Sequence, residues 1–241
     1  MAYLHLVRHG QANSRGGDYD RLTERGFEQT ALLGEYYSQA GVPVDYIASG
    51  TLRRQRETAK GFRDAYKARG RVVSEVKEFA ELNEFAPELW QNLAEKISGA
   101  DKDFARMLDK WRSMRATSER KAAFLFVKMT MNVVQAWVKN RFPDANVEPF
   151  PDFVTRVQSA TEHLPYLKQD AHAFLFTSGT PIAVLVAASV GIQDQPERIL
   201  RMMRWVYNSS VTTLYRHRGR LELVSFNTVP HLANPRSRTL V

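Results

Sequence analysis

Short apolar runs alternate along this chain with longer stretches in which apolar residues recur every three or four positions. The short runs predict β-strands and the recurring pattern predicts amphipathic helices. The predicted strands cover residues 3–7, 44–48, 71–76, 173–177, 211–215 and 221–226, the last two joined by a turn at 217–220. The predicted helices cover residues 24–39, 52–69, 153–168 and 181–190. Because strands and helices alternate, we expect an α/β fold, a three-layer α/β/α sandwich with a mostly parallel sheet.

Two of these helices carry recognisable start signals. Thr23 precedes the first helix and is a typical N-cap residue. Thr180 and Pro181 have the pattern of an N-cap followed by proline at the first helical position. A helix that begins in this way exposes N–H groups, and its dipole favours an anion there.

The middle of the chain has a different pattern. From about residue 87 to 141 the apolar positions keep a helical spacing and show little strand signal. We therefore expect a single domain over residues 1–241 that carries a helical insertion at approximately 87–150. The tryptophans of the insertion (Trp90, Trp111 and Trp137) are expected in its core rather than around a ligand.

The composition is that of a globular protein: of 241 residues, 44% are hydrophobic and 25% are charged. Cysteine is absent, which excludes disulfides, thiolate metal sites and a cysteine nucleophile. No apolar run is long enough for a membrane span, and the first residues lack the pattern of a secretory signal. We therefore expect a cytoplasmic protein with no membrane partner.

The net charge is positive, with 34 Lys and Arg against 26 Asp and Glu, a balance of +8. Such a charge attracts anions. The basic residues are spread along the chain, and no nucleic-acid-binding motif accompanies them, which argues against nucleic acid as the partner. Most of this charge is expected to be solvated surface.

Three predicted strands end in residues suited to phosphate chemistry. They are followed by Arg8-His9-Gly10, by Ser49 with Arg54 downstream, and by Ser178-Gly179-Thr180. Ligand sites in open α/β sheets lie outside the carboxyl ends of the strands. Arginine supplies fixed, charged donors to phosphate oxygens, and a neutral imidazole beside it can act as a nucleophile or base. The residues alone therefore indicate a phosphate site.

Five blocks of the sequence together resemble the histidine phosphatase superfamily (phosphoglycerate mutase-like). They occur in the family's order, over nearly the whole chain: Leu6-Val7-Arg8-His9-Gly10-Gln11-Ala12, Leu22-Thr23-x-x-Gly26-x-x-Gln29, Ser49–Ala59 with Arg54, Leu82-Asn83-Glu84, and Phe226-Asn227-x-x-Pro230-His231-Leu232. The resemblance implies that His9 is the nucleophile and forms a phosphohistidine. It implies that Arg8 and Arg54 hold the phosphate oxygens and that Glu84 is the general acid and base.

The same resemblance implies a phosphomonoester hydrolase that needs no metal and no cofactor. Residues 11–14, Gln-Ala-Asn-Ser, lack the longer signature with a Trp-Asn pair expected of a mutase, so a phosphatase is favoured. The expected partner is a phosphorylated small molecule, or a phosphate or sulfate anion. No pattern in the sequence specifies the natural substrate or the oligomeric state.

The chain departs from the family at Ser178, where the resemblance predicts a second histidine. With Gly179, Ser178 is expected to bind phosphate, but a hydroxyl lacks the charge of an imidazole. Loss of one such donor lowers a rate by about a hundred- to a thousand-fold. Three interpretations stay open: a slow or specialised phosphatase, a phospho-ligand binding protein without chemistry, or an engineered inactivating change. A serine nucleophile is disfavoured because no Gly-x-Ser-x-Gly motif surrounds it.

The insertion is the expected source of substrate choice, because it follows Glu84 and could cover the phosphate site. Its basic residues favour a polyanionic substrate or form a solvated surface; they are Lys102, Lys110, Arg112, Arg115, Arg120 and Lys121. A further alternative is nucleic-acid or phosphoprotein binding through this insertion, which would be strongly salt-dependent.

Overall fold

The computed structural model describes residues 2–13, 20–114 and 119–240. The chain divides into two compact units, one made of Met1–Glu84 with Arg156–Val241 and the other of Phe85–Thr155. That the two belong to one domain stays a prediction. Within the described ranges, no helix combines the length and apolar character needed to cross a membrane.

The larger unit contains a mixed, mostly parallel sheet with the strand order β3-β2-β4-β1-β5-β6. The strands are β1 (Ala2–Arg8), β2 (Tyr46–Ser49), β3 (Lys77–Glu78), β4 (Ala171–Thr177), β5 (Val211–His217) and β6 (Arg220–Thr228). Strands β3, β2, β4 and β1 pair in parallel, whereas β5 is antiparallel to both of its neighbours. The expected α/β class is confirmed, and the carboxyl ends of β1, β2 and β4 meet at one edge of the sheet.

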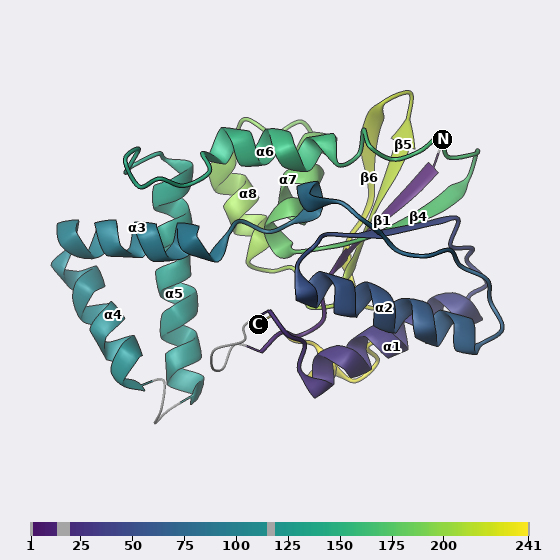
Figure 1. Ribbon diagram of the computed structural model, residues 1–241, viewed down its shortest axis with the longest axis horizontal. Helices are drawn as coiled ribbons and strands as arrows, with labels where there is room; N and C mark the ends of the chain where they lie inside the picture. The colour runs from purple at the N-terminus through teal and green to yellow at the C-terminus, as the bar shows by residue number, and fades with distance from the viewer. Residues whose placement is uncertain (1, 14–19, 115–118, 241) are drawn as a thin grey trace. The chain divides into compact units, whose positions relative to one another are not determined.

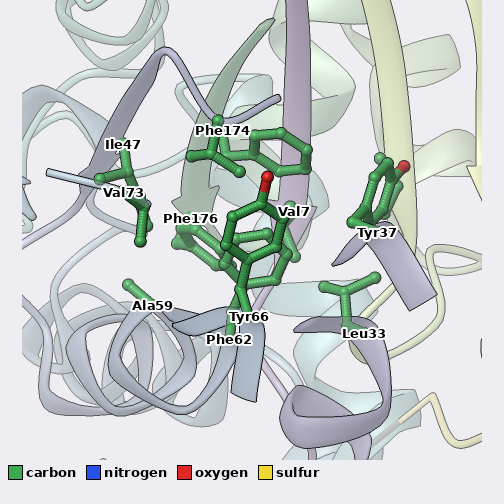
Figure 2. Close-up of a cluster of buried hydrophobic side chains, with 12 residues drawn as sticks. Val7, Leu33, Tyr37, Ile47, Ala59, Phe62, Tyr66, Val73, Phe174 and Phe176 are labelled. Carbon is green, nitrogen blue, oxygen red and sulfur yellow. The ribbon is translucent and has the colours of Figure 1, made fainter. Parts of the chain in front are cut away.

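Helices cover both faces of the sheet (Figure 1). The central strands β1 and β4 are buried along most of their length, as expected of a sheet enclosed by helices. The helices α1 (Glu24–Gln39) and α2 (Arg53–Ala68) pack on one face, and α7 (Gly179–Ser189) packs on the other together with α8 (Pro196–Met203). Figure 2 shows the core of the first face, where Phe62 of α2 stacks on Phe174 of β4 at 5.0 Å between ring centroids. This core packs α2 against the central strands of the sheet.

The structure confirms the start of α1 and corrects the start of α7. Thr23 is the N-cap of α1 and accepts a hydrogen bond from Gly26 N at 3.1 Å. The N-cap of α7 is Ser178, so Thr180 and Pro181 are the second and third helical residues rather than the cap and the first. Proline is tolerated there because the first-turn N–H groups have no partner within the helix.

Two predicted elements were wrong in extent. The segment 71–76 is not a strand: only Lys77 and Glu78 pair, with Ala48 and Ser49 at the end of the short β2. The helix predicted over 153–168 is α6 (Phe150–Ser159), and turns follow it. Pro165 disfavours a helical conformation at the residue before it, which opposes a helix that runs on to residue 168. The helix α8 was not predicted.

The smaller unit is helical, as its spacing predicts. It contains α3 (Pro87–Ala100), α4 (Lys102–Met114) and α5 (Glu119–Val138), and α6 returns the chain to the larger unit. Trp137 is buried against Phe150 and Phe153, and Trp90 is half-buried beside Trp111. Of the six basic residues of the insertion named from the sequence, Lys102, Lys110, Arg112 and Lys121 are exposed. Arg115 and the side chain of Arg120 lie outside the described residues.

Candidate active site

The sheet brings two of the three predicted strand ends into direct contact. In the parallel ladder Arg8 lies opposite Thr177, and one residue further on His9 N donates to Thr177 O at 2.9 Å. The register therefore places His9 beside Ser178. The end of β2 joins them, because Gly50 N donates to Phe176 O at 3.0 Å.

The ring of His9 is held in one tautomer. Its Nδ1 lies 2.8 Å from the carbonyl oxygen of Gly10, which can only accept a hydrogen bond. Nδ1 therefore carries the proton and Nε2 carries a free electron pair. Burial lowers the pKa of His9 well below its usual value, and the nearby charges of Arg54 and Arg8 lower that pKa further. The side chain is therefore a neutral imidazole with its proton on Nδ1.

The backbone around His9 is fixed from two sides. The carbonyl oxygen of His9 accepts hydrogen bonds from Ser209 N at 3.2 Å and from Asn208 Nδ2 at 3.3 Å. On the other side, Gly10 N donates to Thr58 Oγ1 at 3.0 Å. Gly10 must be glycine here, because a Cβ atom would lie 2.6 Å from the carbonyl oxygen of Gly26. These contacts fix the backbone on both sides of His9.

Arg54 comes from the first turn of α2, beside the same loop. The residue is buried, with 5% of its surface exposed, like His9. Thr58 links the two: its Oγ1 donates to Arg54 O at 2.6 Å while accepting from Gly10 N. Thr58 therefore joins the first turn of α2, which carries Arg54, to the loop that carries His9.

Asp20 is a site residue that the sequence did not reveal. Its Oδ1 accepts from Arg54 Nη1 at 2.6 Å and its Oδ2 accepts from Arg53 N at 2.7 Å. Asp20 therefore caps α2, whose own N-cap Leu52 has no side-chain acceptor, and also pairs with Arg54. A cap supplied from 33 residues upstream leaves no local signal in the sequence.

Arg8 completes the basic part of the site. It is half-buried, and its Nη1 donates to the carbonyl oxygen of Val206. Gly179 lies next to it, since a Cβ atom at Gly179 would be 3.9 Å from Arg8 Nε. The predicted phosphate residues of β1 and of the α7 start are therefore neighbours.

Glu84 contacts the start of α7 from a different segment of the chain. Its Oε2 accepts from Thr180 N, in the first turn of α7, at 3.2 Å. Asn83, to which the sequence assigned no role, accepts from Thr51 N at 2.8 Å and donates to Thr51 Oγ1 at 2.7 Å. Arg156 Nη1 donates to three carbonyl oxygens of this segment at 3.2 to 3.3 Å, those of Ala80, Glu81 and Asn83. These contacts hold Glu84 against the start of α7.

Three other histidines, His5, His172 and His231, have structural surroundings. His5 is buried and lies 2.9 Å from His172, nitrogen to nitrogen. His231 Nε2 lies 2.8 Å from Ser209 Oγ, so the family-like ending of the chain supports the residue that binds the His9 carbonyl.

The comparison with known families identifies the family of the chain. The model of the histidine phosphatase superfamily (branch 1) matches residues 4–126, about half of the chain. The chain therefore belongs to the histidine phosphatase superfamily. The matched range contains Arg8, His9, Arg54 and Glu84 and ends before Ser178.

Solved structures share the fold at low sequence identity. Bacillus stearothermophilus YhfR has a TM-score of 0.65 at 20% identity, over 96% of this chain and 100% of its own. Phosphoglycerate mutase from Bacillus anthracis has a TM-score of 0.59 at 17% identity, over 96% and 95%. Mycobacterial glucosyl-3-phosphoglycerate phosphatase, solved with inorganic phosphate, has a TM-score of 0.58 at 22% identity, over 95% and 98%. No curated protein sequence matches the chain.

Proposed function

We propose that this chain is a phosphomonoester hydrolase that works through a phosphohistidine on His9. The observation that carries the proposal is the hydrogen bond from His9 Nδ1 to Gly10 O, in a buried position beside two arginines. It leaves the Nε2 electron pair free and keeps the ring neutral, which is the state a nitrogen nucleophile requires.

The reaction has two displacements. In the first, His9 Nε2 forms a bond to phosphorus while the bond from phosphorus to the ester oxygen breaks. Arg8 and Arg54 stabilise the charge on the non-bridging oxygens. Glu84, in its protonated form, gives its proton to the departing oxygen.

In the second displacement a water molecule attacks phosphorus and the bond to Nε2 breaks. The Glu84 carboxylate takes a proton from that water, and phosphate leaves with His9 neutral again. The hydrogen bond from Thr180 N holds Glu84 next to the phosphate-binding helix start throughout. Ser178 supplies one hydroxyl donor where the family resemblance predicts an imidazole, so we expect a slow enzyme, by about a hundred- to a thousand-fold.

The test is hydrolysis of an aryl phosphate by the wild-type chain with His9→Ala as the control. We expect turnover that is lost in His9→Ala and is inhibited competitively by phosphate and vanadate. Rapid quenching with labelled substrate is expected to trap an acid-labile phosphoryl group on the wild-type protein alone. Turnover that persists in His9→Ala contradicts the proposal.

A second candidate is a phospho-ligand binding protein without turnover. The ion pair between Arg54 and Asp20 favours it, because a carboxylate already engages one of the arginines that would stabilise the transferring phosphoryl group. The same experiment decides between the two: binding of phosphate without hydrolysis supports the second. Binding of a polyanion that weakens steeply with salt would instead indicate the basic surface of the insertion.

A further inference from the structure

A second polar side chain is buried against Ser178. Gln55 follows Arg54 in α2 and is completely buried. Its Nε2 donates one hydrogen to Ser178 Oγ at 2.9 Å and the other to the carbonyl oxygen of Leu82 at 3.1 Å. Burying a glutamine is unfavourable unless its amide finds partners, so these two contacts define its place.

The orientation of this amide follows from its partners. The Leu82 carbonyl can only accept, so the NH₂ group and not the oxygen must face it. The amide oxygen points the other way, toward Gly50, where a Cβ atom would come within 1.9 Å of it. Gly50 therefore makes room for the Gln55 side chain in this orientation, and a flipped amide would bring two acceptor oxygens together.

This orientation decides what Ser178 can do. Since Gln55 Nε2 can only donate, Ser178 Oγ is the acceptor and its own hydrogen stays available. Within the described ranges no acceptor is found for that hydrogen. Ser178 is itself 1% exposed, so water does not readily replace a missing partner.

The hydroxyl lies at the phosphate end of the site. Ser178 directly follows Thr177, which pairs with Arg8 and accepts from His9 N. The next residue, Gly179, is the neighbour of Arg8 Nε. The available hydrogen of Ser178 is therefore placed among the groups proposed to surround the phosphoryl oxygens.

We propose that Gln55 is a positioning residue, which acts through Ser178. By donating to Ser178 Oγ it holds that hydroxyl as a hydrogen-bond donor toward a phosphoryl oxygen bound between Arg8 and Arg54. This inference rests on the proposed function, because it assumes that a phosphoryl group binds there.

The test is a double-mutant cycle with Gln55→Met and Ser178→Ala, singly and together. Methionine keeps the length of the glutamine side chain and removes its donors, and Leu82 O retains the hydrogen bond from Thr177 Oγ1. The readouts are kcat and KM on an aryl phosphate and the Kd for vanadate. Gln39→Met, at the exposed far end of α1, controls for the substitution itself.

We expect Gln55→Met to lower kcat and vanadate affinity by about five- to tenfold with little change in KM, the size of one hydrogen bond. In the Ser178→Ala background the same substitution is expected to change neither quantity. Gln55→Glu is a nearly isosteric second variant: its carboxylate accepts the Ser178 hydrogen and removes the donor from the site. Its effect on kcat is expected to be larger in the wild-type background than in the Ser178→Ala background.

Equal effects of Gln55→Met in both backgrounds would overturn the inference and leave Gln55 a packing residue. So would an unchanged kcat and vanadate affinity in folded Gln55→Met. If vanadate binds but His9→Ala matches the wild-type rate, the proposed activity fails, and the cycle on vanadate affinity still decides the role of Gln55. If neither phosphate nor vanadate binds the wild-type chain, both proposals fail.

Discussion

Replacing Ser178 by histidine tests the site most directly. The structure shows that the effect of this substitution depends on the neighbouring Gln55. An imidazole adds about four non-hydrogen atoms to a side chain that is 1% exposed and touches the fully buried Gln55. Overpacking of this kind costs about 1–3 kcal/mol. We therefore expect Ser178→His alone to lower the free energy of unfolding by that amount.

Gln55→Ala supplies the missing space. It removes about four non-hydrogen atoms and two hydrogen bonds, so by itself it is expected to cost about 2–3 kcal/mol. In the double variant the ring occupies the volume that the glutamine leaves. We expect the double variant to be more stable than the sum of the single variants by about 1–2 kcal/mol.

Urea unfolding followed by tryptophan fluorescence measures the stabilities, and aryl phosphate hydrolysis measures the function. We expect the double variant to exceed Ser178→Ala in turnover by up to about a hundredfold, since an imidazole restores a strong donor beside His9. Strict additivity of the two stability changes would refute the packing argument. A folded double variant that is no faster than Ser178→Ala would refute the idea that the missing donor limits the rate.

Three further predictions concern residues around the site. Burial lowers the pKa of His231 to about 4. Between about pH 6.5 and 4 the unfolded chain therefore binds a proton that the folded chain does not, and the free energy of unfolding falls by up to about 3 kcal/mol as the pH falls. The urea midpoint of His231→Gln is expected to lack this part of the pH dependence. Asp20→Ala is expected to lower the free energy of unfolding by about 1 kcal/mol, because the cap of α2 is lost. The same variant is expected to bind phosphate more tightly, because Arg54 no longer pairs with a carboxylate. Weaker phosphate binding in a calorimetric titration would contradict this. Arg156→Met is expected to lower kcat by about tenfold, because three hydrogen bonds to carbonyl oxygens near Glu84 are lost. Arg156→Lys is expected to restore less than half of this loss. An unchanged kcat in Arg156→Met would show that these hydrogen bonds are not needed to position Glu84.

Much of the framework could be predicted from the sequence because the responsible signals are local. Alternating apolar runs and helical spacing predicted β1, α1, α2 and β4, and Thr23 predicted the start of α1. The failures lie where a neighbour decides the outcome. Residues 71–76 have strand-like composition, but pairing with the four-residue β2 begins only at Lys77.

The candidate site divides in the same way. Arg8, His9, Arg54 and Glu84 could be proposed because each sits in a short block of residues, and the order of these blocks points to the family. By itself, the sequence thus determined the fold class and the residues of the proposed reaction. Only the tertiary structure decided how they are held, because the partners come from distant segments.

Asp20 caps a helix that begins 33 residues later, and Gln55 meets a serine 123 residues away. Such contacts produce no pattern in the sequence, because a hydrogen bond between distant segments depends on which segments the folded sheet places side by side. The proposed nucleophile could therefore be predicted from Arg8-His9-Gly10. The tautomer of His9, its lowered pKa and the direction of the Ser178 hydroxyl depend on burial and on neighbours that only the folded chain brings together.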